Sequence, residues 1–364
     1  MTQIRIFQLD AIRGLAALVV VVFHYVHFAQ PGNRPLEPLL WPIYTFGATA
    51  VPLFFMLSGV ILFAVYADRI ASRSIGWREF LVLRLSRLYP LHLASLLVVA
   101  ALQFAIHEQF GTYFVYKLND LPHFFCNLAL IQFGWFPTGF SFNGPSWSIA
   151  IEAGLYAIFF VFITLCGRAT LPLVITAAIA TVMMAAPTIS WYAPFHRFFL
   201  EGMSCFFIGG CINAFVSSNA PQRHIYYAIT ALVLTGGVVM ALLSAGWGLK
   251  LLIFPALLLS ALRSQWFATI LDRALLRWLG EISYSLYMWH FTVQLIFYLA
   301  SRTLLHIDFG SPITLAAYLL ASLSLANASY YWLELPAKNY IRSRVQTSRR
   351  RYSRSGVRKT VNAP

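Results

Sequence analysis

An arginine and a histidine on the first apolar segment are the side chains best suited to chemistry in this sequence. Arg13 and His24 are separated by eleven residues, which in an α-helix amounts to about three turns plus 20°. They therefore share one helical face, about 16 Å apart along its axis. Asp10 lies three residues before Arg13 and can pair with it. An imidazole accepts a hydroxyl proton near neutral pH, so His24 is a candidate general base; a hydrogen-bonded core histidine is the alternative.

A carboxylate that enters a later apolar segment is the second candidate. The chain-breaking run 143–145 is followed by Trp147 and Ser148, and Glu152 then enters an apolar stretch. Ser148 and Glu152 are four residues apart and share a helical face, and Trp147 suits a membrane interface. A buried carboxylate needs a partner, and His24 or an arginine is the natural one. A purely structural pairing that locks two helices is the alternative.

Two arginines at the start of another apolar segment could hold phosphates. Arg84 and Arg87 are three residues apart, and their forked donors match phosphate oxygens; simple anchoring at the membrane surface is the alternative. Further candidates are small, hydroxyl or aromatic residues for which helix packing is the competing role. These are Ser58 before Gly59, then Ser283, Tyr284, Tyr287 and His290, and Glu334 near the end of the last segment.

The elements that must carry these side chains are transmembrane helices. Of 364 residues, 59% are hydrophobic and 10% charged, whereas soluble chains carry about 25% charged residues. Runs of about 20 apolar residues cross a bilayer, and ten are expected here, together with a shorter helix over 122–136 at the outer face. The fold class is an all-α, polytopic bundle of about ten transmembrane helices. The ten are 10–28, 46–66, 88–106, 148–166, 171–187, 198–216, 225–245, 249–263, 280–299 and 313–333.

Charge predicts the orientation of the bundle. The net charge is +14, and basic residues gather in the loop 67–87 and in the C-terminal tail, so both termini are expected in the cytoplasm. The tail can lie on anionic membrane lipid, which explains the basic balance better than nucleic acid does. The four cysteines form no CxxC pair, and no metal or bound cofactor is expected.

One membrane domain, 1–342, is expected to precede a disordered basic tail, 343–364, which is too polar to fold alone. Asp10 and Arg13 interrupt the first apolar run, so it does not read as a cleavable signal peptide. No fused soluble domain is expected. No internal repeat is detectable, which weakens the case for an inverted-repeat transporter.

Taken together, the motifs resemble the membrane acyltransferase-3 family over about residues 6–340. Each motif is weak alone, but their order is specific. Met56 departs mildly from the aliphatic residue often found there. The matching residues are Leu9-Asp10, Arg13-Gly14, the Arg13-to-His24 spacing, Phe54-Phe55, Ser58-Gly59, Arg84, Arg87 to Pro90, Trp147-Ser148, Glu152, Ile282 to Tyr287, His290, Glu334 and Pro336.

The resemblance implies a membrane-bound O-acyltransferase of the bacterial cytoplasmic (inner) membrane. It would take an acyl group, most often acetyl, from cytoplasmic acyl-CoA as donor substrate to a hydroxyl of an extracytoplasmic or lipid-linked carbohydrate such as a surface polysaccharide. Arg84 and Arg87, with Arg13, would hold the CoA phosphates, and His24 would activate the hydroxyl. Glu152 would orient His24 or stabilise the imidazolium.

Two points stay open after the resemblance. Ser148 and Tyr284 are candidates to support the developing oxyanion. A transporter or flippase for a saccharide or acyl-carrying substrate is the rival function, because it would also use buried arginine, glutamate and histidine.

Overall fold

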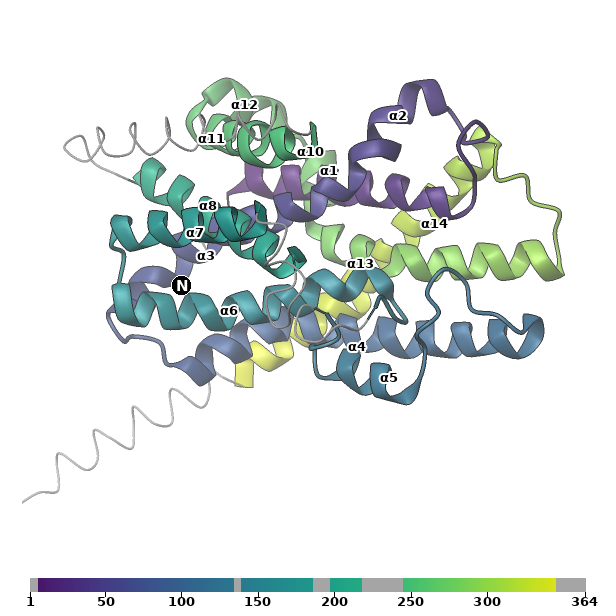
Figure 1. Cartoon of the computed structure of the whole chain (residues 1–364), viewed down its shortest axis with the longest axis horizontal. Helices are drawn as coiled ribbons and strands as arrows, with labels where there is room; N and C mark the ends of the chain where they lie inside the picture. Colours follow the sequence, from purple (N-terminus) through teal and green to yellow (C-terminus); the bar gives the residue numbers. More distant parts are fainter. Residues whose placement is uncertain (1–5, 134–138, 186–196, 218–244, 345–364) are drawn as a thin grey trace, which may run out of the picture.

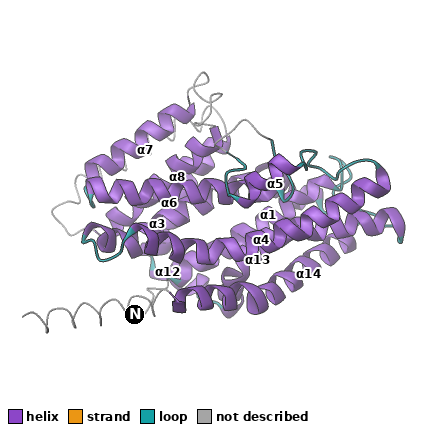
Figure 2. Ribbon diagram, turned by 90° about the horizontal axis from the view of Figure 1, so that it is seen from below, coloured by secondary structure: helices purple, strands orange, loops and turns teal. Residues whose placement is uncertain are grey.

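The computed structural model describes residues 6–133, 139–185, 197–217 and 245–344, and in these ranges it contains helices and no strand (Figure 2). The helices run roughly side by side along the long axis of the molecule (Figure 1). The predicted all-α bundle is therefore confirmed for the described part of the chain. We name its two ends after α1 (Phe7–His24). The end where α1 begins is called the vestibule end, after a chamber described in the next subsection. The end where α1 finishes, at His24, is called the histidine end.

Six helical runs of the described residues are long and apolar enough to cross a membrane, or seven if one bent pair counts as a span. That pair, Leu249–Arg263 and Gln265–Leu271, bends by 94°. The expected number of ten is not reached, and the expected span 225–245 lies almost wholly outside the described residues. The six runs are Phe7–His27, Glu37–Ala71, Trp77–Phe110, Gly144–Cys166, Arg197–Ser217 and Pro312–Arg344.

Two expected spans fail the test for different physical reasons. Helix α7 (Thr170–Ala185) has 16 residues, about 24 Å of helix, which is shorter than the hydrocarbon core. Helix α13 (Ala274–Thr303) has 30 residues but carries many polar side chains. Almost every α13 side chain between Leu279 and Leu295 is buried, so α13 is an inner helix shielded from lipid by its neighbours. Its polar side chains therefore face other helices and the interior of the bundle.

The remaining elements complete the bundle. The segment expected as a helix over 122–136 forms only α5 (Leu121–Leu128), whose first turn is capped by Asp120. The other bounds are η1 Tyr25–His27, α2 Glu37–Phe46, η2 Gly47–Thr49, α3 Ala50–Ala71, α4 Trp77–Phe110, η3 Gly144–Ser146, α6 Trp147–Cys166, α8 Arg197–Ser217, α10 Ala245–Gly248, the π-turn η5 Leu249–Ile253, α11 Phe254–Arg263, α12 Gln265–Leu271, α14 Pro312–Ser329 and the π-turn η6 Tyr330–Glu334.

Glycines bring α1 against α13 at the vestibule end. A Cβ on Gly14 would lie 2.6 Å from the backbone nitrogen of Gly280, and a Cβ on Gly280 would lie 2.4 Å from the carbonyl oxygen of Asp10. Neither helix could come this close with a larger residue, which is how small residues act in membrane helix packing. The close crossing sets the position of Arg13, directly before Gly14, against α13.

A second glycine pair joins α3 to α8. A Cβ on Gly59 would lie 1.9 Å from the carbonyl oxygen of Phe206, and a Cβ on Gly209 would lie 2.1 Å from that of Met56. Because Gly59 faces α8, Ser58 is turned toward the interior between α3 and α6. The Ser58-Gly59 motif thus has one packing residue and one residue available to a site.

Candidate active site

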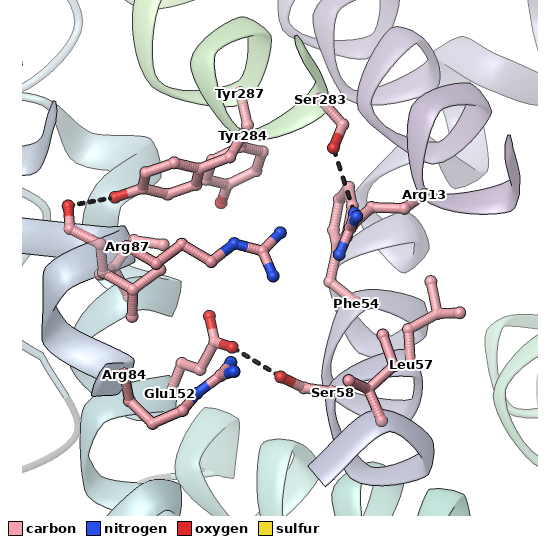
Figure 3. A pocket seen from close by; sticks show the side chains of 13 residues that line it. Arg13, Phe54, Leu57, Ser58, Arg84, Arg87, Glu152, Ser283, Tyr284 and Tyr287 are labelled. Atoms are coloured by element: carbon pink, nitrogen blue, oxygen red, sulfur yellow. Dashed lines mark hydrogen bonds between the residues drawn. The ribbon is translucent and has the colours of Figure 1, made fainter. Parts of the chain in front are cut away.

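A cavity of about 70 Å³ lies in the middle of the bundle between α1, α3, α4, α6 and α13 (Figure 3). It brings together residues far apart in the sequence, including most of those singled out from motifs. They are Arg13, Phe54, Leu57, Ser58, Ile61, Arg84, Arg87, Leu88, Ile149, Glu152, Ser283, Tyr284 and Tyr287. Figure 3 shows the Arg87 side chain extending into the cavity between Tyr284 and Glu152.

Glu152 connects the cavity to an arginine through hydrogen bonds. Its Oε1 accepts from the Ser58 hydroxyl at 2.6 Å and from the Tyr156 hydroxyl at 2.5 Å. The Tyr156 oxygen in turn accepts from Nη2 of Arg84 at 2.8 Å. Arg84 is buried, and its guanidinium also lies 4.7 Å from the centre of the Tyr156 ring. Glu152 was expected to pair with an arginine or with His24. The structure connects it to Arg84 through Tyr156. Among the described residues, it has no hydrogen bond to His24.

Arg13 joins α1 to α13. Its Nη2 contacts the Asp10 carboxylate, as predicted from their spacing, and its Nε donates to the Ser283 hydroxyl at 3.2 Å. At the other end of the same helix, the His24 ring lies 4.8 Å from the His290 ring, measured between centroids. Arg13 and His24 thus both face α13, which confirms that they share one side of α1.

A larger chamber of about 280 Å³, here called the vestibule, lies beside the cavity and shares Arg13, Ile61, Arg84 and Arg87 with it. Both described ends of the chain line the vestibule, with Ile6 on one side and Arg342 on the other, so these ends meet at the same end of the bundle. Its other lining residues are Leu9, Asp10, Ala64, Val65, Tyr66, Glu281, Tyr330, Glu334 and Lys338.

Positive charge exceeds negative charge in the vestibule, whose lining has five basic and three acidic side chains among the residues that the structure describes. No carboxylate of a described residue lies within ion-pair distance of Arg87, Lys338 or Arg342. Nε of Arg342 and Nε of Arg84 are buried without a hydrogen-bond partner in the described structure. Buried donors without acceptors are costly, so the vestibule is suited to a ligand that carries several anionic oxygens.

His24 ends α1 at the histidine end and is oriented by two elements. Its Nδ1 lies 2.9 Å from the carbonyl oxygen of Val20, one turn earlier, and its own carbonyl accepts from the Gln294 amide at 2.7 Å. His24 is partly exposed, whereas His290 behind it is fully buried. Nε2 of His24 has no hydrogen-bond partner among the described residues, which leaves it available to a hydroxyl.

Two aromatic rings separate the cavity from the histidines. Phe54 and Tyr287 pack edge to face, with centroids 5.7 Å apart, and the Tyr287 ring lies 5.9 Å from the His290 ring. The Tyr287 hydroxyl donates to the carbonyl oxygen of Pro145 at 2.7 Å and lies 2.8 Å from the Ser148 hydroxyl. Ser148 therefore holds the partition from the α6 side.

Two other expected site residues have structural partners. The Tyr284 hydroxyl lines the cavity but donates to the carbonyl oxygen of Leu88 at 2.6 Å, so this proton is already engaged. The Trp147 ring packs among phenylalanines, 4.9 Å from Phe198 and 5.4 Å from Phe133 between centroids. Trp147 thus packs within the protein, beside the helix start that carries Ser148 and Glu152.

Sequence reasoning missed several residues of this region. In the sequence, Lys338 and Arg342 count only among the C-terminal basic residues that indicate the orientation of the bundle, but they line the vestibule because the last helical run continues to Arg344. Glu334, Lys338 and Arg342 repeat every four residues and so share a helical face, which was a usable signal. Tyr156 and Gln294 carried no motif that could have marked them. The described residues contain no group of three or more histidine, cysteine or acidic side chains that could hold a metal ion.

Comparison with known proteins agrees with the motifs. A family model described as an acyltransferase domain, acyltransferase-3, matches residues 6–331. The chain belongs to the acyltransferase-3 family. The match spans α1 to the end of α14 and therefore includes the cavity, the partition and the histidines. The chain is an O-acyltransferase, and its helices are those of a multi-pass membrane protein.

Curated relatives carry related names. The acyltransferase MdmB of Streptomyces mycarofaciens is 28% identical over 80% of this chain and 79% of that protein. The exopolysaccharide production protein ExoZ of Rhizobium meliloti (strain 1021) is 23% identical over 84% of this chain and 94% of that protein. YrhL of Bacillus subtilis (strain 168), provisionally named a peptidoglycan O-acetyltransferase, is 24% identical over 91% of this chain but only 54% of its own length. No solved structure matches the chain.

Proposed function

We propose that this enzyme transfers an acetyl group from acyl-CoA to a hydroxyl of an extracytoplasmic or lipid-linked carbohydrate. The observation that carries the proposal is the vestibule with its excess of basic side chains, which adjoins the central cavity and shares Arg13, Arg84 and Arg87 with it. A polyanionic donor suits the wide, basic chamber. Its slender acylated end suits the narrow cavity beyond.

The donor side is supported by charge. The phosphates of CoA would bind Arg87, Lys338 and Arg342, since charge-assisted hydrogen bonds to phosphate are short and strong. Arg84 is held by Tyr156 and, through it, by Glu152, so Glu152 acts in this proposal as a counter-charge that fixes the arginine pair. The neutral pantetheine arm would pass into the cavity, away from the charges.

The acceptor side is supported by the position of His24 at the opposite end of α1, about 16 Å from Arg13 along the helix axis. The acceptor hydroxyl would approach from the histidine end. To reach the thioester, either the acyl group or the hydroxyl must pass the Phe54–Tyr287 partition. We expect the Tyr287 ring to turn aside when both substrates are bound.

The reaction is a single acyl transfer. Nε2 of His24 takes the proton of the acceptor hydroxyl as its oxygen forms a bond to the thioester carbonyl carbon. The carbon–sulfur bond then breaks, and the CoA thiolate receives that proton. The products are the ester and free CoA thiol, so atoms and charges balance. Protonated His24 keeps its Nδ1–H directed at the Val20 carbonyl throughout.

The carbohydrate acceptor is supported by the names of two relatives, one concerned with exopolysaccharide production and the other with peptidoglycan O-acetylation. In this proposal the enzyme resides in the bacterial inner membrane, has about ten spans and keeps both termini in the cytoplasm. The basic loop 67–87 and the basic C-terminal tail support that orientation. With this orientation the vestibule would open toward cytoplasmic acyl-CoA.

Two measurements test the proposal. The purified protein in lipid nanodiscs should release thiol from acetyl-CoA when the surface glycan of the native strain is supplied, and radiolabelled acetyl should appear on that glycan. A strain that lacks the protein should lose a base-labile acetyl group from the glycan by mass spectrometry. An unchanged glycan in that strain, or saccharide movement across the bilayer without thiol release, would reject the proposal.

A further inference from the structure

A glutamine on helix α13 determines which ring nitrogen of His27, at the histidine end, carries the hydrogen. Gln294 is fully buried, and its amide nitrogen donates to the carbonyl oxygen of His24 at 2.7 Å. A backbone carbonyl can only accept, so this contact determines which end of the amide is nitrogen. The amide oxygen, Oε1, therefore faces Nδ1 of His27, which lies 3.3 Å away.

The tautomer of His27 follows from the direction of that amide. Because Oε1 of Gln294 can only accept, Nδ1 of His27 must carry the hydrogen, and in the neutral ring Nε2 is left as an acceptor. His24 has the same form, since its Nδ1 faces the carbonyl oxygen of Val20 at 2.9 Å. Both rings therefore present a lone pair at Nε2.

The rings that carry the two acceptors are neighbours, and both are partly exposed. The centroids of the His24 and His27 rings are 5.4 Å apart, and both side chains are partly exposed. Neither Nε2 has a hydrogen-bond partner among the described residues. His290 has no such access, because it is fully buried behind His24; it supports the ring, with Nδ1 held 2.6 Å from the carbonyl oxygen of Tyr287.

We propose that His27 binds a second hydroxyl of the acceptor, next to the one that His24 activates, so that the enzyme selects a pair of adjacent hydroxyls. Two neighbouring lone pairs call for a ligand with two neighbouring donors, and adjacent ring carbons of a sugar offer this arrangement. The inference rests on the proposed function and narrows its acceptor to a diol. His27 is then a binding residue that touches the substrate without exchanging a proton.

Other ligands fit these two rings less well. A carboxylate or phosphate has no donors for two lone pairs, and the cluster of basic side chains suited to an anion lines the vestibule, at the other end of α1. A metal ion would need further ligands, and the described residues near His24 supply no suitable group of three. A neutral polyol satisfies both acceptors and introduces no charge into the membrane domain.

Two small alcohols test the idea directly. Acetyl-CoA and either trans-cyclohexane-1,2-diol or cyclohexanol are given to the protein in nanodiscs, and ester formation is followed by mass spectrometry. The wild type should prefer the diol in kcat/KM by about tenfold, the effect of one hydrogen bond. His27→Phe should reduce this preference to the statistical ratio of two hydroxyls to one, and the readout is the ratio of the two kcat/KM values within the variant, so that an equal loss with both alcohols does not count. His27→Gln, which restores an acceptor oxygen near the position of Nε2, should recover part of the preference.

The outcomes separate this inference from the proposed function. A wild-type preference no larger than the statistical ratio, or a full preference in His27→Phe, overturns diol recognition. The same holds if neither alcohol is acylated by protein that still labels the native glycan. If the wild-type protein neither labels the glycan nor releases thiol from acetyl-CoA, the proposed function is overturned instead. If His27→Phe does not fold, the wild-type preference and His27→Gln still decide the question.

Discussion

The vestibule and the histidine end are both polar regions of a chain that is otherwise largely apolar, but they differ in kind. The vestibule is lined by Arg13, Arg84, Arg87, Lys338 and Arg342, with fewer acids to match them. The histidine end has imidazole rings whose Nδ1 atoms face carbonyl and amide oxygens. Fixed positive charge recognises an anion at some distance, whereas oriented lone pairs recognise hydroxyls only on contact. One bundle can thus keep a charged donor and a neutral acceptor apart until they react.

The largest expected effect comes from removing the base at the histidine end. His24→Ala should lower acyl transfer by about 10²- to 10⁴-fold, the usual contribution of general base catalysis. The KM for acetyl-CoA should change little, because the proposed donor site, the vestibule, lies at the other end of the bundle. Thiol release and glycan labelling measure the loss, and size-exclusion chromatography checks the fold. Full residual activity would remove His24 from the chemistry.

Removing charge from the vestibule should have the complementary signature. Lys338→Ala or Arg342→Ala should raise the KM for acetyl-CoA by about tenfold each, since a hydrogen bond to phosphate is lost. Neither variant should alter the diol preference at the histidine end. S-acetylpantetheine, which lacks the phosphates, is the matched donor: it should react equally with wild type and variants. An equal loss with both donors would point to a general structural defect.

The helix crossing that joins the two regions offers a third prediction. Gly14→Ala would push a methyl group toward Gly280, at 2.6 Å from its nitrogen, and overpacking of this kind costs about 1–3 kcal/mol. Thermal stability should fall, and transfer should fall with it because Arg13 and His24 are displaced from α13 together. Gly76→Ala is the control, since nothing lies within 4 Å of the added Cβ and its melting temperature should match the wild type.

The smallest effect is expected at the cavity between the two regions. Ser58→Ala removes one hydrogen bond to Glu152 but leaves the one from Tyr156. The interactions that hold Glu152 in place should therefore weaken by about 1 kcal/mol, the net contribution of one hydrogen bond. A rise of a few-fold in the KM for acetyl-CoA, with kcat nearly unchanged, is expected in steady-state kinetics, because Glu152 is proposed to fix the arginine pair of the donor site. A total loss of activity in this variant would show that Ser58 has a direct role in the reaction.

Much of the site could be predicted from sequence because local spacing decides which side chains share a helical face. The side of α1 shared by Arg13 and His24 and the Asp10 pairing both follow from 100° per residue. The expected role of Glu152 as the partner of His24 could not be checked in this way. Spacing does not say which neighbouring helix a helical face will contact. In the packed bundle, Glu152 accepts hydrogen bonds from Ser58 and Tyr156.

The sequence by itself determined that this protein is embedded in a membrane and which family it resembles. The length of its apolar segments and the order of its motifs are properties of the linear chain. Only the tertiary structure decided the rest. Lys338 and Arg342 join the vestibule because the last helical run passes beside α4, and α13 is an inner helix because its neighbours cover it. The lone pair of His27 is fixed by its contact with Gln294. Gln294 lies 267 residues from His27 in the chain, a separation that no local pattern spans.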